Sequence, residues 1–180
     1  KEYACKGYFM EKQEWYAVQV RTGKEHIVAE LCRKQIGSDI LKECFVPMYE
    51  RKRRYEGMWH KEELRLFPGY IFMVTEQIHE LFKNLKELTK ILCVGNEFVP
   101  LKDSEVKFLR ETGGDKYLLK VSEGYITGKQ VIITSGPMTK LVGEIKFIDR
   151  HKRMAIIQTE MFGRIMDIRL GLEIVTKVEK

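Results

Sequence analysis

The sequence has few cysteines and few prolines, four of each among 180 residues, and it contains no long hydrophobic run. No stretch approaches the roughly 18 consecutive apolar residues of a transmembrane helix, and the first residues lack an apolar core long enough for a secretory signal. The cysteines are far apart, so their spacing predicts neither a paired-thiolate metal site nor a disulfide framework. These absences argue against a membrane span and against export, and we expect a cytoplasmic protein.

The spacings that carry catalytic or metal chemistry are also missing. The four histidines are not arranged as zinc ligands with a nearby glutamate or cysteine. There is no glycine-rich phosphate loop ending in Lys-Ser or Lys-Thr, and there is no G-x-S-x-G motif. We therefore expect no metal, no cofactor and no enzymatic activity, which leaves binding surfaces as the features to interpret.

Positive charge is concentrated toward the C-terminus. The net charge of +6 and the isoelectric point near 9.0 favour polyanionic partners. Residues 1–112 carry 20 basic and 18 acidic side chains, whereas residues 125–180 carry 10 and 6. The C-terminal third thus holds most of the excess.

The first part of the chain alternates between strand and helix patterns. A capping-box pattern, Thr22-x-x-Glu25, precedes a run of apolar residues at helical spacing, and Gly37 can end that helix. Residues 50–63 are too polar for a core, which predicts a β-ribbon or a loop. Predicted strands cover residues 15–20, 44–49, 66–74 and 91–94. Two further helices are predicted, one beginning near Ile78 and the other spanning Ser104–Glu111. This order predicts an α/β sandwich with helices over one sheet.

The second part of the chain shows only strand patterns. A glycine-containing segment, residues 113–128, predicts a connection between the two parts. About 55 residues of short strands predict a small closed barrel rather than a sandwich. The strand-length runs are residues 129–136, 141–149, 154–161 and 163–170, with a candidate fifth at 173–178.

The aromatic segment LFPGYIF, residues 66–72, is a candidate binding surface. Its aromatic and aliphatic side chains cannot all be exposed cheaply, so one interpretation places them all in the core. A strand has two faces, however, and one of them can bind helices of a partner. The sequence leaves both interpretations open.

Two basic segments are candidate phosphate-binding surfaces. The run at residues 51–54 is either a solvated hairpin tip or a phosphate contact flanked by Tyr55 and Trp59. In the barrel, Lys140 and the turn at residues 150–153 are the better candidates, because loops can converge at one end of a barrel. Other basic residues of the barrel are expected on its solvated side.

These motifs, in this order, resemble those of NusG-type transcription elongation factors. The matching segments are WYAVQVRTGKE, FVPMYERKRR, LFPGYIFM, GKQVIITSGPMTKLVGEIKFID and TEMFGRIMDIRL. The resemblance covers nearly all of the chain from Trp15 on, and Gly-Pro-Met followed by Val-Gly-Glu-Ile matches the KOW motif. Several matches in the right order make the resemblance specific.

The resemblance implies an α+β protein with two domains. An NGN α/β sandwich, with an antiparallel four-stranded sheet and helices, is followed by a small SH3-like KOW β-barrel. The implied boundaries are residues 10–112 for the NGN domain, 113–124 for the linker and 125–180 for the KOW domain. Residues 1–9 are expected to be an extension or a cloning remnant, with the natural start at Met10.

The resemblance also implies a monomeric factor that binds the clamp helices of the largest subunit of RNA polymerase. By stabilising the closed clamp, such a factor suppresses pausing and termination without making or breaking a bond. The segment beginning with Ile78 and His79 takes the place where family members touch the opposite side of the polymerase cleft. The implied polymerase-binding residues are Tyr16, Phe67, Tyr70, Phe72 and His79.

The basic barrel, the brief linker and the basic hairpin resemble most the LoaP-type specialised antiterminators, which are recruited by an RNA hairpin in a leader transcript. The residues expected to bind that RNA are Arg51, Lys52, Arg53, Arg54, Lys140, Arg150, Lys152, Arg153 and Arg164. The alternative is a general NusG-like factor whose KOW domain binds a small-subunit ribosomal protein or the termination factor Rho without RNA specificity. A ribosomal protein with a KOW barrel is disfavoured, because +6 is a low charge for that class. A barrel that refolds into helices is disfavoured by its Ile, Val and turn glycines.

Overall fold

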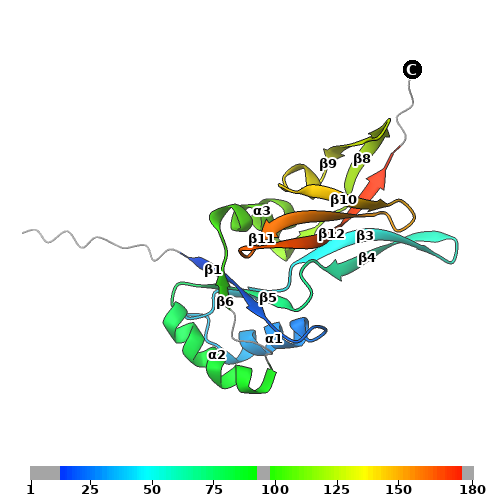
Figure 1. The fold of residues 1–180 in the computed structure, drawn as a ribbon. Helices are drawn as coiled ribbons and strands as arrows, with labels where there is room; N and C mark the ends of the chain where they lie inside the picture. The colour runs from blue at the N-terminus through cyan, green and yellow to red at the C-terminus, as the bar shows by residue number, and fades with distance from the viewer. Residues whose placement is uncertain (1–12, 93–97, 176–180) are drawn as a thin grey trace, which may run out of the picture.

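A computed structural model describes residues 13–92 and 98–175. Its N-terminal sheet has four antiparallel strands in the order β2-β5-β1-β6, with α1 and α2 on one face (Figure 1). The α+β class and the four-stranded antiparallel sheet with helices are as the sequence predicted. The elements are β1 (Glu14–Gln19), α1 (Glu25–Gln35), β2 (Glu43–Phe45), β5 (Tyr70–Thr75), α2 (Ile78–Leu92), β6 (Phe98–Pro100) and α3 (Asp103–Gly113).

The central strand β5 is buried on both faces of this sheet. Ile71 and Met73 face α1 and α2, where they pack with Val28 and Leu81. Phe72 belongs to a second core on the opposite face. Because successive side chains of a strand point to opposite faces, one apolar run supplies both cores.

The predicted capping box at Thr22 is wrong. Helix α1 starts at Glu25 with Lys24 at its N-cap, and no side chain caps it. The carboxylate of Glu25 is fully buried and accepts hydrogen bonds from the backbone N–H groups of Gly23, at 2.9 Å, and Gly69, at 2.8 Å. The acidic residue therefore ties α1 to the turn before β5 instead of closing a local cap, a contact 44 residues away that no local pattern encodes.

The polar segment at residues 50–63, predicted as a β-ribbon or a loop, forms a long β-hairpin. Strands β3 (Met48–Tyr55) and β4 (Met58–Arg65) pair antiparallel up to Tyr55 and Met58. The turn residues Glu56 and Gly57 both have positive φ, 51° and 77°, which matches the right-handed twist of two-residue hairpins. A short parallel strand, β7 (Leu118–Leu119), joins β3 on its other edge.

Three predicted strand boundaries are wrong. The run at 44–49 is split at Pro47 into β2 and β3, which belong to different sheets, because proline cannot donate to a ladder. In the run at 66–74 the strand starts only at Tyr70, after a turn at Gly69 with φ of 84°. In the run at 91–94, Ile91 and Leu92 are helical, because α2 continues to Leu92. Cys93 and Val94 lie outside the described residues. The edge strand of the sheet is β6 instead.

The C-terminal sheet has five curled strands in the order β10-β11-β12-β8-β9 (Figure 1), in agreement with an SH3-like KOW architecture. The predicted fifth strand is wrong: Glu173 and Ile174 extend β12, and the additional strand is β8, from the segment predicted as a connection. Residues 176–178 of that predicted strand lie outside the described residues. The elements are η1 (Gly114–Lys116), β8 (Ser122–Thr127), β9 (Gln130–Ser135), η2 (Pro137–Thr139), β10 (Glu144–Asp149), β11 (Met154–Met161) and β12 (Arg164–Ile174).

The two parts of the chain pack against each other. The core on the second face of the N-terminal sheet contains residues of both parts, including Phe72 and Leu109 from the first and Ile157 and Leu170 from the second. At Gly171 of β12 an added Cβ would lie 2.2 Å from the backbone oxygen of Glu50 in β3, so only glycine allows this approach. Across residues 13–92 and 98–175, no helix has the length and apolarity needed to cross a membrane.

Candidate functional site

Three of the aromatic side chains predicted to bind a partner lie together. We call Phe67, Tyr70 and Phe72 the aromatic face, because all three belong to the core on the side of the sheet away from α1 and α2. Their rings lie 5.0, 5.6 and 5.5 Å, centroid to centroid, from the ring of Phe162. Phe162 comes from the turn between β11 and β12, so the C-terminal sheet covers the aromatic face.

Polar contacts hold Phe162 in this position. Its backbone N–H donates a 2.8 Å hydrogen bond to one carboxylate oxygen of Glu105, and the other oxygen accepts from Lys102 N–H at 2.7 Å. Phe162 and Gly163 have positive φ, 56° and 70°, which forms a tight turn with the ring pointing inward. The guanidinium of Arg164 lies 6.0 Å from the ring centre of Tyr70. Glu105 thus caps α3 and also anchors the turn that covers the aromatic face.

Tyr16, predicted as part of the same surface, lies elsewhere. Its ring packs edge-on against Phe82 of α2, at 6.1 Å between centroids, on the helix-covered face of the sheet. Its hydroxyl donates a hydrogen bond to Glu14. Burial, together with this hydrogen bond and the charge of Glu14, raises the pKa of Tyr16 to about 12. The structure therefore separates Tyr16 from the aromatic face.

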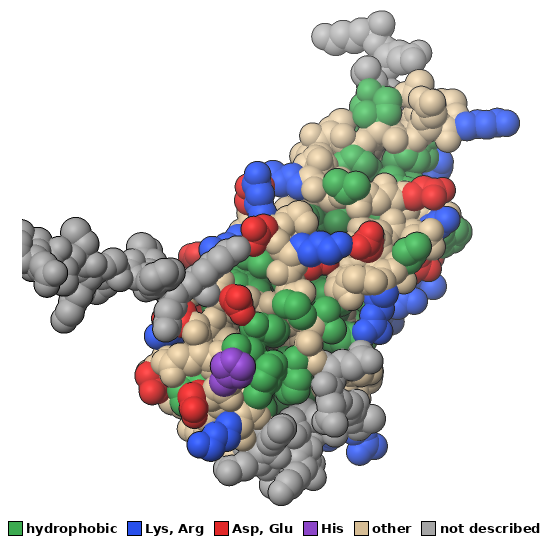
Figure 2. Space-filling model, turned by 60° about the vertical axis from the view of Figure 1, so that its left-hand side comes forward, with side chains coloured by type: hydrophobic (Ala, Val, Ile, Leu, Met, Phe, Trp, Pro, Cys, Tyr) green, Lys and Arg blue, Asp and Glu red, His purple; other side chains and the backbone are tan. Residues whose placement is uncertain are grey.

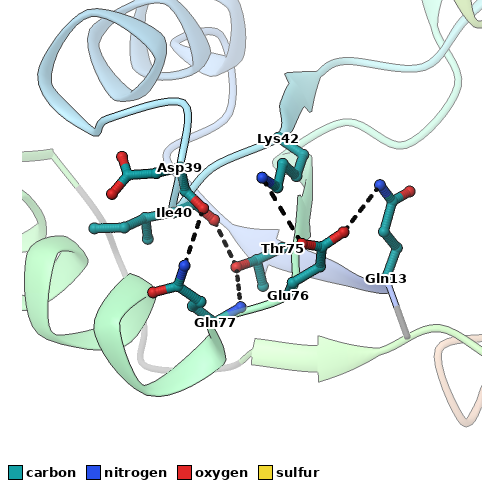
Figure 3. A network of polar contacts seen from close by, with 7 residues as sticks. All are labelled: Gln13, Asp39, Ile40, Lys42, Thr75, Glu76 and Gln77. Carbon is teal, nitrogen blue, oxygen red and sulfur yellow. Dashed lines mark hydrogen bonds and ion pairs between the residues drawn. The ribbon is translucent and has the colours of Figure 1, made fainter. Parts of the chain in front are cut away.

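His79 is exposed in the first turn of α2. A polar network fixes the corner between β5 and this helix (Figure 3). Thr75 Oγ1 donates to Ile40 O at 2.6 Å and accepts from Gln77 N–H at 2.9 Å, while the Gln77 side chain donates to Asp39 O at 3.2 Å. The start of α2 is thus held rigidly, so a partner that touches His79 meets a preformed surface on the far side of the sheet from Phe72.

The predicted basic run on β3 is divided between half-buried and exposed positions. Arg51 forms an ion pair with Glu62 at 2.8 Å, and Lys52 forms one with Glu173 of β12. Arg53 and Arg54 are exposed near the hairpin tip, with Arg53 3.5 Å from Glu62. Lys52 therefore connects the two parts of the protein, Arg51 pairs within the hairpin, and the last two residues of the run face solvent.

The turn between β10 and β11 lies beside this hairpin (Figure 1). The guanidinium of Arg153 stacks 3.4 Å from the ring centre of Trp59 and forms a 2.6 Å ion pair with Glu173. Arg150 and Lys152 of the same turn are exposed. The backbone N–H of Lys152 donates to Asp149 at 2.8 Å, and this bond lowers the pKa of Asp149.

Two of the predicted basic segments therefore converge, although they are about 100 residues apart in the sequence. We call the exposed side chains of Arg53 and Arg54, which point to opposite faces of the hairpin end, and those of Arg150 and Lys152 the basic ridge. A surface of this composition suits the phosphate backbone of a nucleic acid. On the face drawn in Figure 2, by contrast, Lys and Arg side chains mingle with Asp and Glu around a broad hydrophobic area.

Lys140 and Arg164 do not join the basic ridge. Lys140 Nζ lies 3.2 Å from the Glu111 carboxylate of α3, and Arg164 lies beside Tyr70 on the aromatic face. Both residues thus lie where the C-terminal sheet meets the first part of the chain. Sequence reasoning missed the residues that organise these surfaces, Glu105, Phe162 and Glu173; only the acidic residue at the start of α3 gave a local signal, that of a helix cap.

Metal ligands are not gathered in the part of the chain that the structure describes. No group of three or more His, Cys, Asp or Glu side chains in that part could hold a metal ion. Cys32 and Cys44 are buried free thiols of the first core.

Comparisons with known proteins agree with this architecture. A family model described as "Transcription termination factor nusG" matches residues 13–110. The protein "Transcription termination/antitermination protein NusG" of Rickettsia typhi is 26% identical over 176 residues, which cover 92% of this chain and 90% of the relative. Its namesake from Staphylococcus carnosus is 27% identical, with 92% and 96% covered.

A solved structure is similar as well. It is described as "Domain interaction in Thermotoga maritima NusG", is 26% identical in sequence, and superimposes with a TM-score of 0.58. The alignment covers 89% of this chain and 94% of that chain. The likeness therefore extends over both sheets.

Proposed function

Because this chain belongs to the NusG family of transcription termination and antitermination factors, we propose that it binds the clamp helices of RNA polymerase, suppresses pausing and termination, and is recruited by a structured hairpin in a leader RNA. In this proposal it acts as a LoaP-type specialised antiterminator. The aromatic face binds the polymerase and the basic ridge binds the RNA. The factor catalyses no reaction.

The aromatic face is the observation that carries the polymerase part of the proposal. Phe67 and Phe72 are 1% and 0% exposed, and the ring of Phe162 is part of what covers them. Aromatic rings gathered on one sheet face need an apolar cover, and helices of a partner can replace the Phe162 turn. Polymerase binding then requires the C-terminal sheet to leave the aromatic face, and its free energy must exceed that of the packing it replaces.

The effect on transcription follows from linkage. A factor that binds the polymerase more tightly when the clamp is closed stabilises the closed state by the difference between the two affinities. Pausing and termination are accompanied by clamp opening, so both are suppressed. His79, at the rigid start of α2, is positioned for a second contact across the cleft.

The basic ridge supports the RNA part of the proposal. Double-stranded RNA is recognised mainly by its shape and its phosphates, which four exposed cations at the end of the β3–β4 hairpin and in the adjacent β10–β11 turn can contact. Arg150 and Lys152 belong to the turn between β10 and β11, where Lys152 contacts Asp149 of the C-terminal sheet. Their contacts with RNA can therefore persist after the two parts separate, so that the RNA hairpin keeps hold of the factor while the polymerase binds.

A general elongation factor is the second candidate. The relatives from Rickettsia typhi and Staphylococcus carnosus carry the general name "Transcription termination/antitermination protein NusG", which favours it. In that case the C-terminal sheet binds a small-subunit ribosomal protein or Rho, and RNA binding follows charge without regard to sequence or structure.

The substitution Tyr70→Ala tests the proposal. It removes an aromatic ring from the proposed polymerase surface, so we expect it to reduce polymerase binding and suppression of pausing in a purified transcription assay. Binding of the leader RNA hairpin should be unchanged, which also shows that the variant is folded. Tyr55→Ala is the matched control, because Tyr55 is half exposed at the hairpin turn. Normal antipausing activity in the Tyr70 variant would contradict the proposal, and equal binding to all RNAs would favour the general factor.

A further inference from the structure

A groove lies where the β3–β4 hairpin meets the C-terminal sheet. Its volume is about 520 Å³, within the range of sites that hold small ligands. The first part of the chain contributes Arg51 and Arg65, and the C-terminal sheet contributes Phe147, Lys152 and Arg169. We call these five residues the junction groove. It exists only while the two parts are packed together.

Four Arg or Lys side chains line the junction groove. Three of them are ion-paired: Arg51 with Glu62 at 2.8 Å, Arg65 with Glu25 at 3.0 Å, and Lys152 with Asp149 at 3.7 Å. Arg169 is exposed and forms no ion pair or side-chain hydrogen bond within the described part of the chain. The unpaired charge of Arg169 beside these guanidinium and ammonium groups favours an anionic ligand.

Arg51 and Arg169 line the junction groove together with the buried Tyr49. Burial raises the pKa of Tyr49, while the charges of Arg51 and Arg169 oppose that rise. Arg51 comes from β3 and Arg169 from β12, so guanidinium groups of both parts act on the same point at the floor of the groove. Guanidinium groups form planar, paired hydrogen bonds with phosphate oxygens.

An aromatic side chain lies among these cations. Phe147 on β10 is 55% exposed, which is unusual for a phenylalanine on a strand of a packed sheet. Aromatic rings beside cations are the recurring design of surfaces that bind single-stranded nucleic acids, because each base can stack on a ring while the cations follow the phosphates. The groove volume suits one or two nucleotides of such a strand.

We propose that the junction groove binds a single-stranded segment of RNA, with phosphates at Arg51 and Arg169 and a base on Phe147. The proposal rests on the proposed function, which brings the protein to a transcript, and it adds a second RNA site that shares only Lys152 with the basic ridge. A single-stranded nucleic acid supplies both a phosphate for the cationic side chains of the groove and a base that can stack on Phe147.

The site has a consequence for the proposed polymerase contact. The junction groove is complete only in the packed arrangement, in which Phe162 covers the aromatic face. A strand in the groove therefore stabilises the arrangement that polymerase binding must undo, and each ligand weakens the other by the same factor. The RNA strand leaves the groove when the aromatic face is exposed.

Binding of a fluorescent 12-nucleotide oligouridine, which cannot form a hairpin, tests the site. The full chain is titrated by fluorescence anisotropy at several salt concentrations, and compared with the double variant Phe147→Ser with Arg169→Gln. We expect affinity to fall at least tenfold, and the salt slope to flatten by about 0.7 for one lost phosphate contact. The matched control is Ile165→Ser with Arg21→Gln, two exposed positions outside the groove, which should bind like the wild type.

A second variant tests the need for packing without removing a charge. Gly171→Ala places a Cβ against the backbone of Glu50 and forces β12 away from β3. Oligouridine binding should fall as it does for the groove variant, with circular dichroism confirming that both parts stay folded. If the variant is unfolded, a Phe162→Ala variant provides the same separation from the other end of the interface.

The outcomes separate this site from the proposed function. Wild-type affinity in the groove variant, an equal loss in the control pair, or uridine triphosphate that binds as tightly as the oligonucleotide would overturn the proposal. Wild-type oligouridine binding by a folded Gly171→Ala protein would overturn the dependence on packing. Binding of a blunt RNA hairpin and of polymerase is measured in parallel: if both persist while the oligouridine result is negative, only the junction groove is refuted.

Discussion

The carboxylate of Glu105 accepts a hydrogen bond from the backbone N–H of Phe162 at 2.8 Å, and thereby joins the start of α3 to the turn that covers the aromatic face. Both groups are buried, so the bond is shielded from water. The same carboxylate also accepts from Lys102 N–H at the start of the helix. One side chain thus links the stability of α3 to the packing of the two parts, and it controls access to the surface proposed for polymerase.

Replacing Glu105 should loosen this junction. Glu105→Ala leaves two backbone donors without their acceptor, which we expect to cost about 2–3 kcal/mol of unfolding free energy. Packing of the C-terminal sheet should weaken, and polymerase affinity should rise. Urea unfolding and a polymerase-binding assay measure the two effects. Glu123→Ala, at an exposed position on β8, is the control, and a stability loss without any gain in polymerase affinity would contradict the proposed role of the turn.

Removing the covering ring should have a larger effect on the aromatic face. Phe162 is 4% exposed, and truncating a buried phenylalanine to alanine commonly costs about 3–5 kcal/mol. In Phe162→Ala we expect part of this cost to appear as separation of the two parts, seen as faster proteolysis between α3 and β8 and as tighter polymerase binding.

Ile165→Ala provides the comparison for Phe162→Ala, because Ile165 is 73% exposed beside the same turn. It should change neither proteolysis nor binding. Unchanged polymerase affinity in a folded Phe162→Ala protein would mean that the aromatic face is a permanent core and not a docking surface.

The basic ridge should account for hairpin binding. Replacing Arg53 and Arg54 together by glutamine removes two exposed cations, so binding of a leader RNA hairpin should weaken and its salt slope should fall by about one for each lost phosphate contact. Lys116→Gln with Lys129→Gln makes the same change in net charge at exposed positions off the ridge. Equal effects of the two pairs would reduce the ridge to general electrostatic attraction.

Local patterns in the sequence predicted an α/β sandwich, its helices and the hairpin, because periodicity and turn residues encode these directly. The α+β class followed from the family resemblance. Local patterns failed at Pro47, which separates strands of two sheets, and at β8, whose pairing with β12 is parallel and distant in sequence. Phe67, Tyr70 and Phe72 come from one segment, so their proximity was predictable, whereas their role as a docking surface stays a prediction. The sequence did not predict that Phe162 covers these rings, because the hydrogen bond that holds Phe162 joins it to Glu105, 57 residues away.

The buried carboxylate of Glu25 should make stability depend on pH. Burial by itself raises its pKa, but hydrogen bonds from Gly69 and Gly23 and the charge of Arg65 outweigh this, so the pKa is lowered from its ordinary value of 4.5. Because the pKa of Glu25 is lower in the folded state, its ionised carboxylate stabilises the protein at pH values above the ordinary pKa. This contribution is lost as the pH falls through the folded-state pKa.

Glu25→Gln should therefore cost about 2–3 kcal/mol of unfolding free energy at pH 7, because buried backbone donors lose a charged acceptor. The difference from wild type should shrink as the pH falls below about 4.5, as measured by urea unfolding at a series of pH values. Glu144→Gln, with a side chain 74% exposed, should match the wild type throughout, and a constant Glu25→Gln deficit from pH 7 to the acid limit would show that its carboxylate contributes shape rather than charge.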